Sequence, residues 1–237
     1  MFKRLILGIL FAFNTALYAL DSIDLLNSFE EEYSTKEPSD PLYGYNHFIY
    51  TLNWEVYDYA LNPLLKAYNK MIPLGYRYGI YNFFDNLTSP LRFLAHLLAF
   101  EPKEAMDELG RFALNSSVGI LGLFDVASQN GLYSHKTDFG IAFGKWGIES
   151  GAYLVLPLLG PSSVRDTLAM PLNALANPIS YLNPTLLSIT TSTLKEFSSV
   201  AYHKNTIDSL RQGAISDGYI LMRDAYFQYR NELIKGD

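Results

Sequence analysis

The sequence predicts an all-α fold, and three observations support this. Proline follows a short polar residue at 40–41, 62–63 and 89–90, which is typical of helix starts because the polar side chain caps free amides and proline has no N–H to leave unpaired. Between these points, apolar residues recur every three or four positions, as on one face of a helix. No stretch alternates apolar and polar residues like a half-buried strand, and no repeat has a fixed period. We therefore expect one helical domain over residues 40–237.

The composition limits the possible classes of protein. The chain has 237 residues, of which 49% are hydrophobic and 15% aromatic, enough to build a sizeable core. Its 18 Tyr and 15 Phe residues suit either a membrane–water interface or an aromatic core. A formal net charge of -6 without a cluster of Lys and Arg argues against a general nucleic-acid-binding protein. The absence of cysteine predicts no disulfide framework, no thiol nucleophile and no lipidated N-terminal cysteine.

Residues 1–19 have the composition of a secretory signal peptide. Lys3 and Arg4 provide its positive start, residues 5–13 its apolar centre, and Ala19 the small residue after which we expect cleavage. The apolar run is shorter than the roughly 20 residues needed to span a bilayer, so we expect cleavage rather than a retained anchor. Residues 20–39 are rich in glutamate and are expected to form an acidic linker.

Helical segments are expected throughout the domain. Pro63 should restart or kink the first helix, Gly75 and Gly79 should form a turn, and Ser89–Pro90 should open a separate helix. In the terminal helix after Ser216–Asp217, the residues Tyr219, Met222, Ala225, Tyr226, Tyr229 and Leu233 share one face. The expected segments before that helix are 41–59, 64–71, 80–87, 91–100, 103–127, 185–202 and 205–211.

Two of these segments are apolar enough to enter a membrane. Only Arg92 and His96 interrupt the segment 91–100, and residues 118–124 contain no charge. A helix that is apolar all round lies in a core or faces lipid, and at about 15 Å the first segment can enter a bilayer but cannot cross it. The residues expected in the membrane are Leu91, Phe93, Leu94, Leu97, Leu98, Phe100, Ile120, Leu121, Leu123 and Phe124.

Residues 138–166 hold five glycines around an apolar segment and a Lys–Trp pair. Such a density of glycine permits bends, hinges and close approach of the backbone to other groups. We expect residues 144–151 to be the flexible part. Lys145 and Arg165 flank the apolar segment, and either they bind the phosphate of a lipid headgroup or they are ordinary surface charges. The rings of Phe139, Trp146 and Tyr153 are either anchors at a membrane interface or part of a core.

The sequence contains no convincing catalytic or metal site. Residues 140–146 resemble a phosphate-binding loop, but the spacing is one residue short and Trp146 stands where Ser or Thr must meet magnesium. Ser162–Ser163 lack a nucleophile elbow, and Arg165–Asp166 reads more simply as an ion pair or a helix cap. The histidines, which lack metal-binding spacing, are His47, His96, His135 and His203. We predict that the chain is not an enzyme and needs no cofactor or metal.

Several blocks of the chain together form a more specific pattern. Asp40–Asn46 reads D-P-x-x-G-[FY]-N, and it is followed by matching blocks at 82–87, 111–127 and 223–228. Within the glycine-rich stretch the matching positions are Phe139, Gly140, Gly144, Gly147, Tyr153, Leu156, Pro157, Gly160, Arg165 and Asp166. In this order the blocks resemble the MlaA/VacJ family of outer-membrane phospholipid-transport components, over nearly all of the chain after Pro38.

The resemblance implies a ring-shaped helical domain in the periplasmic leaflet of the outer membrane, beside a trimeric porin. A central amphipathic channel would pass phospholipid misplaced in the outer leaflet to a periplasmic lipid-carrier protein, and so maintain lipid asymmetry. The residues implied to flank the channel or form its hinge are Gly140, Gly144, Lys145, Trp146, Gly147, Gly151, Tyr153 and Arg165.

Two features depart from the family pattern, and two other functions are compatible with the residues. Members commonly carry a lipidated cysteine, which this sequence lacks, so we expect the apolar helices to hold the chain in the membrane. Glu149 places a charge between Gly147 and Gly151, where it faces either the channel or water.

One alternative function is that of a scaffold that packs against a porin around a closed, dry centre. The other is a lipid hydrolase, which needs a nucleophile and a base in one pocket.

Overall fold

The computed structural model describes residues 40–213 and 218–236. Their fold is almost entirely helical, as the sequence predicts, with one short hairpin in addition. The expected signal peptide, the acidic linker and the Ser216–Asp217 cap lie outside the described residues.

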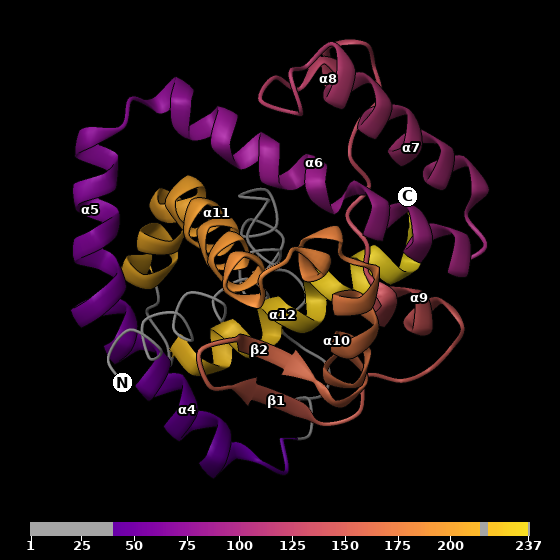
Figure 1. Cartoon of the computed structure of the whole chain (residues 1–237). Coiled ribbons are helices and arrows are strands. Elements are labelled where there is room, and N and C mark those ends of the chain that lie inside the picture. Colours follow the sequence, from indigo (N-terminus) through magenta and orange to yellow (C-terminus); the bar gives the residue numbers. More distant parts are fainter. Residues whose placement is uncertain (1–39, 214–217, 237) are drawn as a thin grey trace.

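The first helices form an outer arc. They are α4 (Tyr43–Val56), the π-helix η2 (Tyr57–Leu61), α5 (Asn62–Met71) and α6 (Leu74–Leu98). Figure 1 shows these helices following one another around the outside of the molecule, with α11 (Thr185–Gly213) inside the arc. The π-helix ends two residues before Pro63. Pro63 has no N–H to give to a regular helical bond, so a wider turn accommodates the expected irregularity there.

The first helix begins later than expected because Asp40 has other partners. Its N-cap is Leu42, without a side-chain cap bond. Asp40 Oδ1 instead accepts from Asn46 Nδ2 at 3.0 Å, and its second oxygen accepts a short hydrogen bond from the hydroxyl of Tyr219. The Asp40–Pro41 pair therefore ties the start of α4 to α12 (Gly218–Lys235).

The expected boundaries at Gly75–Gly79 and Ser89–Pro90 are wrong, because α6 is one helix of 25 residues that contains Pro90. A side-chain ion pair crosses the proline, since Arg92 on one side contacts Asp85 on the other at 3.1 Å. The hydroxyl of Thr88 also donates to the carbonyl oxygens of Phe84 and Asp85, at 3.2 and 2.8 Å, just before the proline. Tertiary contacts thus override the local stop signal.

The helix expected at 103–127 is shorter, because α7 (Pro102–Ser117) ends ten residues earlier and residues 118–124 form turns. Ile120 and Leu121 have positive φ angles of 52° and 57°. At Gly122 a Cβ atom would lie 2.4 Å from Cβ of Asn86 on α6, so only glycine lets the turn pack there. The short helix α8 (Val126–Gln129) follows, capped by Asp125.

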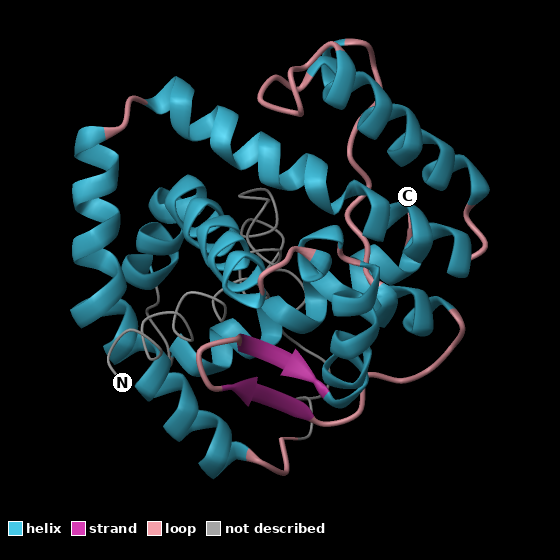
Figure 2. Cartoon of the chain, viewed as in Figure 1, coloured by secondary structure: helices cyan, strands magenta, loops and turns pink. Residues whose placement is uncertain are grey.

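The glycine-rich stretch folds into a helix and a hairpin. Helix α9 (Phe139–Lys145) is followed by β1 (Tyr153–Leu156) and β2 (Gly160–Ser163), which pair antiparallel with Tyr153 opposite Ser163 (Figure 2). The hairpin turn uses positive φ angles of 64° at Leu158 and 75° at Gly160. The strands are too short to produce an alternating pattern in the sequence, which is why only helices were expected.

The remaining elements complete the interior. Helix α10 (Val164–Ala176) and the 3-10 helix η3 (Pro178–Tyr181) lead into α11, which spans both segments expected at 185–202 and 205–211. One core cluster joins α5, η2 and α11, and a second joins α4, β1 and α12. In the second, Tyr219 and Tyr226 are buried on the expected face of the terminal helix, with Arg223 and Arg230 buried beside them.

Candidate functional site

A cavity of about 500 Å³ lies between α6, α9, α10, α11, α12 and the hairpin. This volume is typical of small-ligand sites, which span roughly 300–1,000 Å³. Apolar side chains such as Leu91, Ile141, Met170 and Leu233 form part of its wall. The charged side chains in the wall are Arg92, Lys136, Asp138, Asp166, Lys195, Glu196 and Arg230.

Arg92 organises the charges on the α6 side of the cavity. Its Nε donates to Glu108 Oε2 at 2.8 Å, and its two terminal nitrogens donate to Asp85 at 3.1 and 3.2 Å. Lys136 Nζ also reaches Asp85, at 3.1 Å. Burial alone would raise the pKa of Asp85, but the charges of Arg92 and Lys136 outweigh burial and lower that pKa far below its usual value. Asp85 therefore stays ionised at neutral pH.

Arg230 organises the charges on the opposite side, on α12. Its two terminal nitrogens donate to Asp138 at 2.6 and 2.9 Å, and its Nε lies 2.8 Å from Asp166. Asp138 is also the N-cap of α9, because its side chain accepts from the amide of Ile141 at 2.9 Å. A single arginine thus fixes the starts of α9 and α10 against α12.

Asp166 is held by further partners. Arg165 Nε donates to it at 2.9 Å, and the hydroxyl of Tyr226 donates to it in a short hydrogen bond. Burial would raise the pKa of Asp166, but the charge of Arg230 and the bonds from Arg165 and Tyr226 lower it. An ionised, multiply bonded carboxylate suits structure rather than proton transfer. Among residues 40–213 and 218–236, no three His, Asp or Glu side chains are grouped to hold a metal ion.

Two asparagines on α4 fix the hairpin that closes one side of the cavity. Asn46 donates to the carbonyl oxygen of Tyr153 at 3.0 Å and accepts from the amide of Val155 at 2.8 Å. Asn53 makes the same two kinds of bond one helical repeat later, to Leu156 O at 3.0 Å and Leu158 N at 2.6 Å. Seven residues is about two turns, so both side chains lie on one face of α4. The far side of the hairpin supplies Leu159, Pro161 and Ser162 to the cavity wall.

Gly140 and Gly144 are helical, and close packing explains them. A Cβ at Gly140 would lie 2.4 Å from Asp166 Oδ1, and one at Gly144 would lie 2.4 Å from Ile234 Cδ1 and 2.8 Å from a nitrogen of Arg165. Gly147 and Gly151, by contrast, lie in the loop before β1 with positive φ angles of 86° and 69°. The glycines expected to act together therefore serve two different purposes.

Lys145 and Arg165 do not line the cavity. Lys145 forms a short ion pair with Glu101, and Arg165 pairs with Asp166 and donates to Ile148 O at 3.1 Å. Both cations thus hold the ends of the glycine-rich loop. Glu149, in that loop, is exposed and is not part of the cavity wall.

The three rings singled out from the sequence have different surroundings. Tyr153 is completely buried beside Tyr219 and Tyr226, so it belongs to the core. Phe139 is partly buried, whereas Trp146 is 46% exposed and donates its indole N–H to Leu98 O at 2.9 Å.

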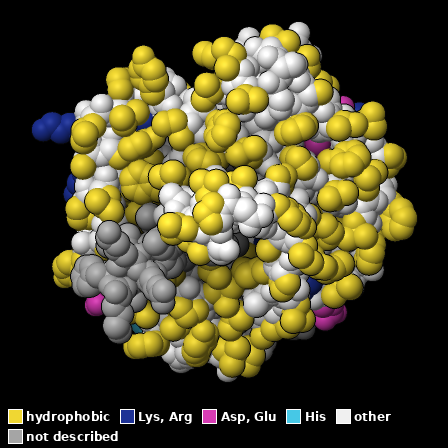
Figure 3. All heavy atoms as spheres, in the orientation of Figure 1, with side chains coloured by type: hydrophobic (Ala, Val, Ile, Leu, Met, Phe, Trp, Pro, Cys, Tyr) yellow, Lys and Arg dark blue, Asp and Glu magenta, His cyan; other side chains and the backbone are white. Residues whose placement is uncertain are grey.

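The residues expected in a membrane differ in how much of each side chain is exposed on the surface of the protein. Leu91 is buried, Phe93 and Leu98 are partly buried, and the rest are exposed: Leu94, Leu97, Phe100, Ile120, Leu121, Leu123 and Phe124. Hydrophobic side chains cover most of the face shown in Figure 3, and charged side chains lie mainly at its edge. Among the described residues, none of the helices combines the length and hydropathy that a membrane crossing requires.

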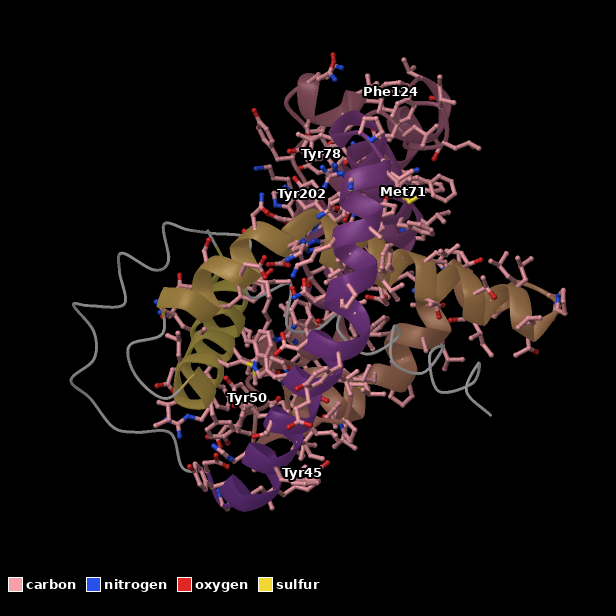
Figure 4. All side chains as sticks on the ribbon, turned by 90° about the vertical axis from the view of Figure 1, so that its left-hand side faces the viewer. Tyr45, Tyr50, Met71, Tyr78, Phe124 and Tyr202 are labelled. Carbon is pink, nitrogen blue, oxygen red and sulfur yellow. The ribbon has the colours of Figure 1, made fainter. Side chains whose placement is uncertain are left out.

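A second apolar region was missed in the sequence. Residues 167–194, from α10 through η3 into α11, contain no Asp, Glu, Lys, Arg or His. This segment projects to one side in Figure 4, and Leu168, Leu175, Tyr181 and Leu186 on it are each more than 60% exposed. The run without charge was the available signal, but interspersed Ser, Thr, Asn and Pro masked it.

Comparison with known proteins agrees with the sequence pattern. The family model described as MlaA lipoprotein matches residues 38–233. This chain belongs to the MlaA family. The intermembrane phospholipid transport system lipoprotein MlaA of Shigella flexneri is 33% identical over 202 residues, which cover 84% of this chain and 79% of that protein. The protein of the same name from Escherichia coli K12 is 32% identical over the same length.

A solved structure extends the comparison to three dimensions. A chain described under "Structural basis for maintenance of bacterial outer membrane lipid asymmetry" superimposes with a TM-score of 0.73 at 31% identity, covering 83% of this chain and all of the other. An uncharacterised protein of Rickettsia prowazekii is 32% identical over 166 residues, or 69% of this chain and 66% of its own length. The likeness to that structure therefore covers most of the fold. The named relatives are lipoproteins, whereas the present sequence has no cysteine.

Proposed function

We propose that this MlaA-family chain is the outer-membrane component of an intermembrane phospholipid transport system. It removes phospholipid from the outer leaflet by letting the headgroup pass through the central cavity. The observation that carries the proposal is a cavity with charged side chains in its wall, enclosed by helices whose outer surface is strongly apolar. A polar path through such a shell spares a headgroup the cost of entering hydrocarbon.

The apolar surface supports a seat in the periplasmic leaflet. We propose that the projecting segment 167–194 and the exposed side chains at 94–100 and 118–124 contact lipid, while the arc of α4, α5 and α6 offers a surface to a trimeric porin. On that arc Tyr45, Met71 and Tyr78, labelled in Figure 4, are exposed. Transfer onward would require a periplasmic lipid-carrier protein.

The hinge is proposed to be the loop that contains Gly147 and Gly151. Because Asn46 and Asn53 fix the hairpin to α4, movement there would occur between α9 and the hairpin. Both of these elements contribute to the cavity wall, so such a movement would change its width.

A cell-based experiment tests whether the cavity is the route. Ala174 lines the cavity on an exposed part of α10, and Ala113 is also exposed, on α7, but does not line the cavity. In a deletion strain, surface phospholipid is labelled with a membrane-impermeant amine reagent. We expect wild type and Ala113→Trp to restore low labelling, and Ala174→Trp to fail because the indole blocks the opening.

The alternative scaffold function predicts another result. A protein that only packs against a porin would tolerate a filled cavity, so full restoration by Ala174→Trp would favour the scaffold. Unchanged labelling in the deletion strain itself would refute the transport function. The open, charged cavity favours transport over a scaffold with a dry centre, and the buried carboxylates in ion pairs give no support to hydrolysis.

A further inference from the structure

The part of the cavity wall that comes from the projecting segment 167–194 carries no charge, because this segment contains no Asp, Glu, Lys, Arg or His. Its polar side chains in the wall are Thr167, Asn173, Asn177, Ser180 and Ser192. The charged side chains of the wall all come from other parts of the chain. A ligand therefore meets only neutral hydrogen-bonding groups along this part of the wall.

Backbone amides hold Asn173 and Asn177 in one orientation. Asn173 Oδ1 accepts from the amide of Phe139 at 3.0 Å, at the start of α9. Asn177 Oδ1 accepts from the amide of Ile179, also at 3.0 Å. Because a backbone N–H can only donate, both side-chain oxygens are in use and both NH2 groups point away from these contacts. No residue in the described part of the chain accepts a hydrogen bond from either NH2 group.

The two free NH2 groups lie close together on the cavity side of α10. Asn173 is in the last turn of this helix, and Asn177 is its C-cap. Residues four positions apart are neighbours on a helix surface, with about 6 Å between their Cβ atoms. Both side chains line the cavity and are partly exposed. Two fixed, uncharged donors at this spacing suit a ligand that carries two neutral acceptor oxygens.

Helix α10 presents the three kinds of surface that a phospholipid requires. Asp166, in its first turn, is paired with Arg230 at 2.8 Å and belongs to the charged wall. Asn173 follows about 10 Å further along the helix, at 1.5 Å per residue. Leu168 and Leu175 on the same helix are 72% and 64% exposed. In a phospholipid, the ester carbonyls likewise lie between a charged headgroup and apolar acyl chains.

We propose that the NH2 groups of Asn173 and Asn177 donate hydrogen bonds to the ester carbonyl oxygens of a phospholipid in the cavity. This inference rests on the proposed transport function and names the part of the lipid that the uncharged wall recognises. Diacyl phospholipids share these esters whatever their headgroup, so the contact does not depend on the headgroup. Lipids with ether linkages in place of the esters are bound more weakly.

Native mass spectrometry of the purified full chain in detergent tests the contact. The chain is titrated with diacyl phosphatidylethanolamine or with its dialkyl ether analogue of the same chain length, which keeps the phosphate and lacks both carbonyls. We expect the diacyl lipid to bind about tenfold more tightly, as the loss of two neutral hydrogen bonds implies. Equal binding, or tighter binding of the ether lipid, overturns the contact but leaves the transport function standing. Binding of neither lipid overturns both.

A matched pair of variants locates the preference at the carboxamides. Asn173→Asp keeps an oxygen for the amide of Phe139 and removes the NH2 group, so the preference for the diacyl lipid should fall about threefold. The added charge acts on the same headgroup in both lipids and leaves their ratio unchanged. Ala174→Asp adds this charge at a neighbouring lining position and should keep the full preference. An unchanged ratio in Asn173→Asp, or an equal fall in both variants, overturns the assignment.

An uncharged substitution tests the second asparagine. In Asn177→Ser the hydroxyl can still cap the amide of Ile179, but the side chain is shorter and has no NH2 group. The melting temperature shows that the variant is folded, and its preference for the diacyl lipid should also fall about threefold. A folded Asn177→Ser variant with the wild-type preference overturns the role assigned to Asn177.

Discussion

The packing around Gly140 gives a direct test of the cavity's second charge network. A Cβ at this position would lie 2.4 Å from Asp166 Oδ1 and 2.7 Å from a terminal nitrogen of Arg230. Neither side chain can move aside freely, since Arg230 also holds Asp138 through two hydrogen bonds and Asp166 is held by Arg165. Gly140→Ala must therefore push apart a buried ion pair.

The expected loss of stability in Gly140→Ala follows from two opposing effects. Removing a partner from a buried ion pair costs about 3–5 kcal/mol, and displacing it costs less, so we take about 3 kcal/mol. Alanine in a helix returns about 0.5–1 kcal/mol relative to glycine. The net loss of roughly 2 kcal/mol should lower the melting temperature by about 4–8 °C for a chain of this size.

Circular dichroism during heating of the purified chain measures this change. Gly75→Ala is the matched control, because Gly75 is also the second residue of its helix, α6, and no atom lies within 4 Å of an added Cβ. The control should melt at the wild-type temperature or above it. If Gly140→Ala also melts at the wild-type temperature or above it, the Asp166–Arg230 ion pair can move aside without cost, and the reasoning fails.

Three further changes test other parts of the structure. Asn46→Leu leaves two buried backbone groups of the hairpin unpaired, at a cost of about 2–4 kcal/mol. It should therefore speed amide hydrogen exchange over residues 153–163, whereas the control Asn130→Leu, on an exposed helix end, should not. Because its pKa is lowered in the fold, the ionised Asp85 stabilises the protein above the pKa of an unfolded aspartate, about 3.9, and this stability is lost as the pH falls toward the folded pKa. Urea unfolding should therefore give a lower free energy of unfolding at pH 3 than at pH 7. In Asp85→Asn this difference between the two pH values should be smaller by roughly 1 kcal/mol. Leu186→Glu places a charge on the projecting segment at a cost of about 2.5–3.5 kcal/mol if that segment is in lipid, so carbonate should release more of this variant from membranes. Ser209→Glu, at the other end of the same helix, is the control. Equal retention of the two variants in membranes would argue against contact of the projecting segment with lipid.

The sequence predicted those features of the helices that depend on residues close together in the chain. The helix start expected at residue 103 agrees with α7, which begins at Pro102, and the expected face of α12 is buried at Tyr219 and Tyr226. Pro90 does not end its helix, because the Asp85–Arg92 ion pair across it depends on tertiary burial. Two turns separate these residues, so an isolated arginine in an apolar run, with a carboxylate seven positions before it, was a usable signal for a buried pair.

The cavity could not be predicted in the same way. Its charged wall joins residues as distant in the chain as Arg92 and Arg230, and no local pattern records that meeting. The glycines show a related limit, because Gly140 is required by a neighbouring side chain and Gly147 by its own positive φ angle. The sequence shows the same residue type in both places.

The asparagines of α4 also protect the hairpin from unwanted association. An open edge of a sheet exposes N–H and C=O groups that another polypeptide can pair with, which leads to strand exchange and aggregation. Along β1 and its turn, four of those groups are occupied by the carboxamides of Asn46 and Asn53: the C=O groups of Tyr153 and Leu156 and the N–H groups of Val155 and Leu158. Two side chains thus do part of the work of a third strand, and during passage through a crowded envelope these four groups are not available to another polypeptide.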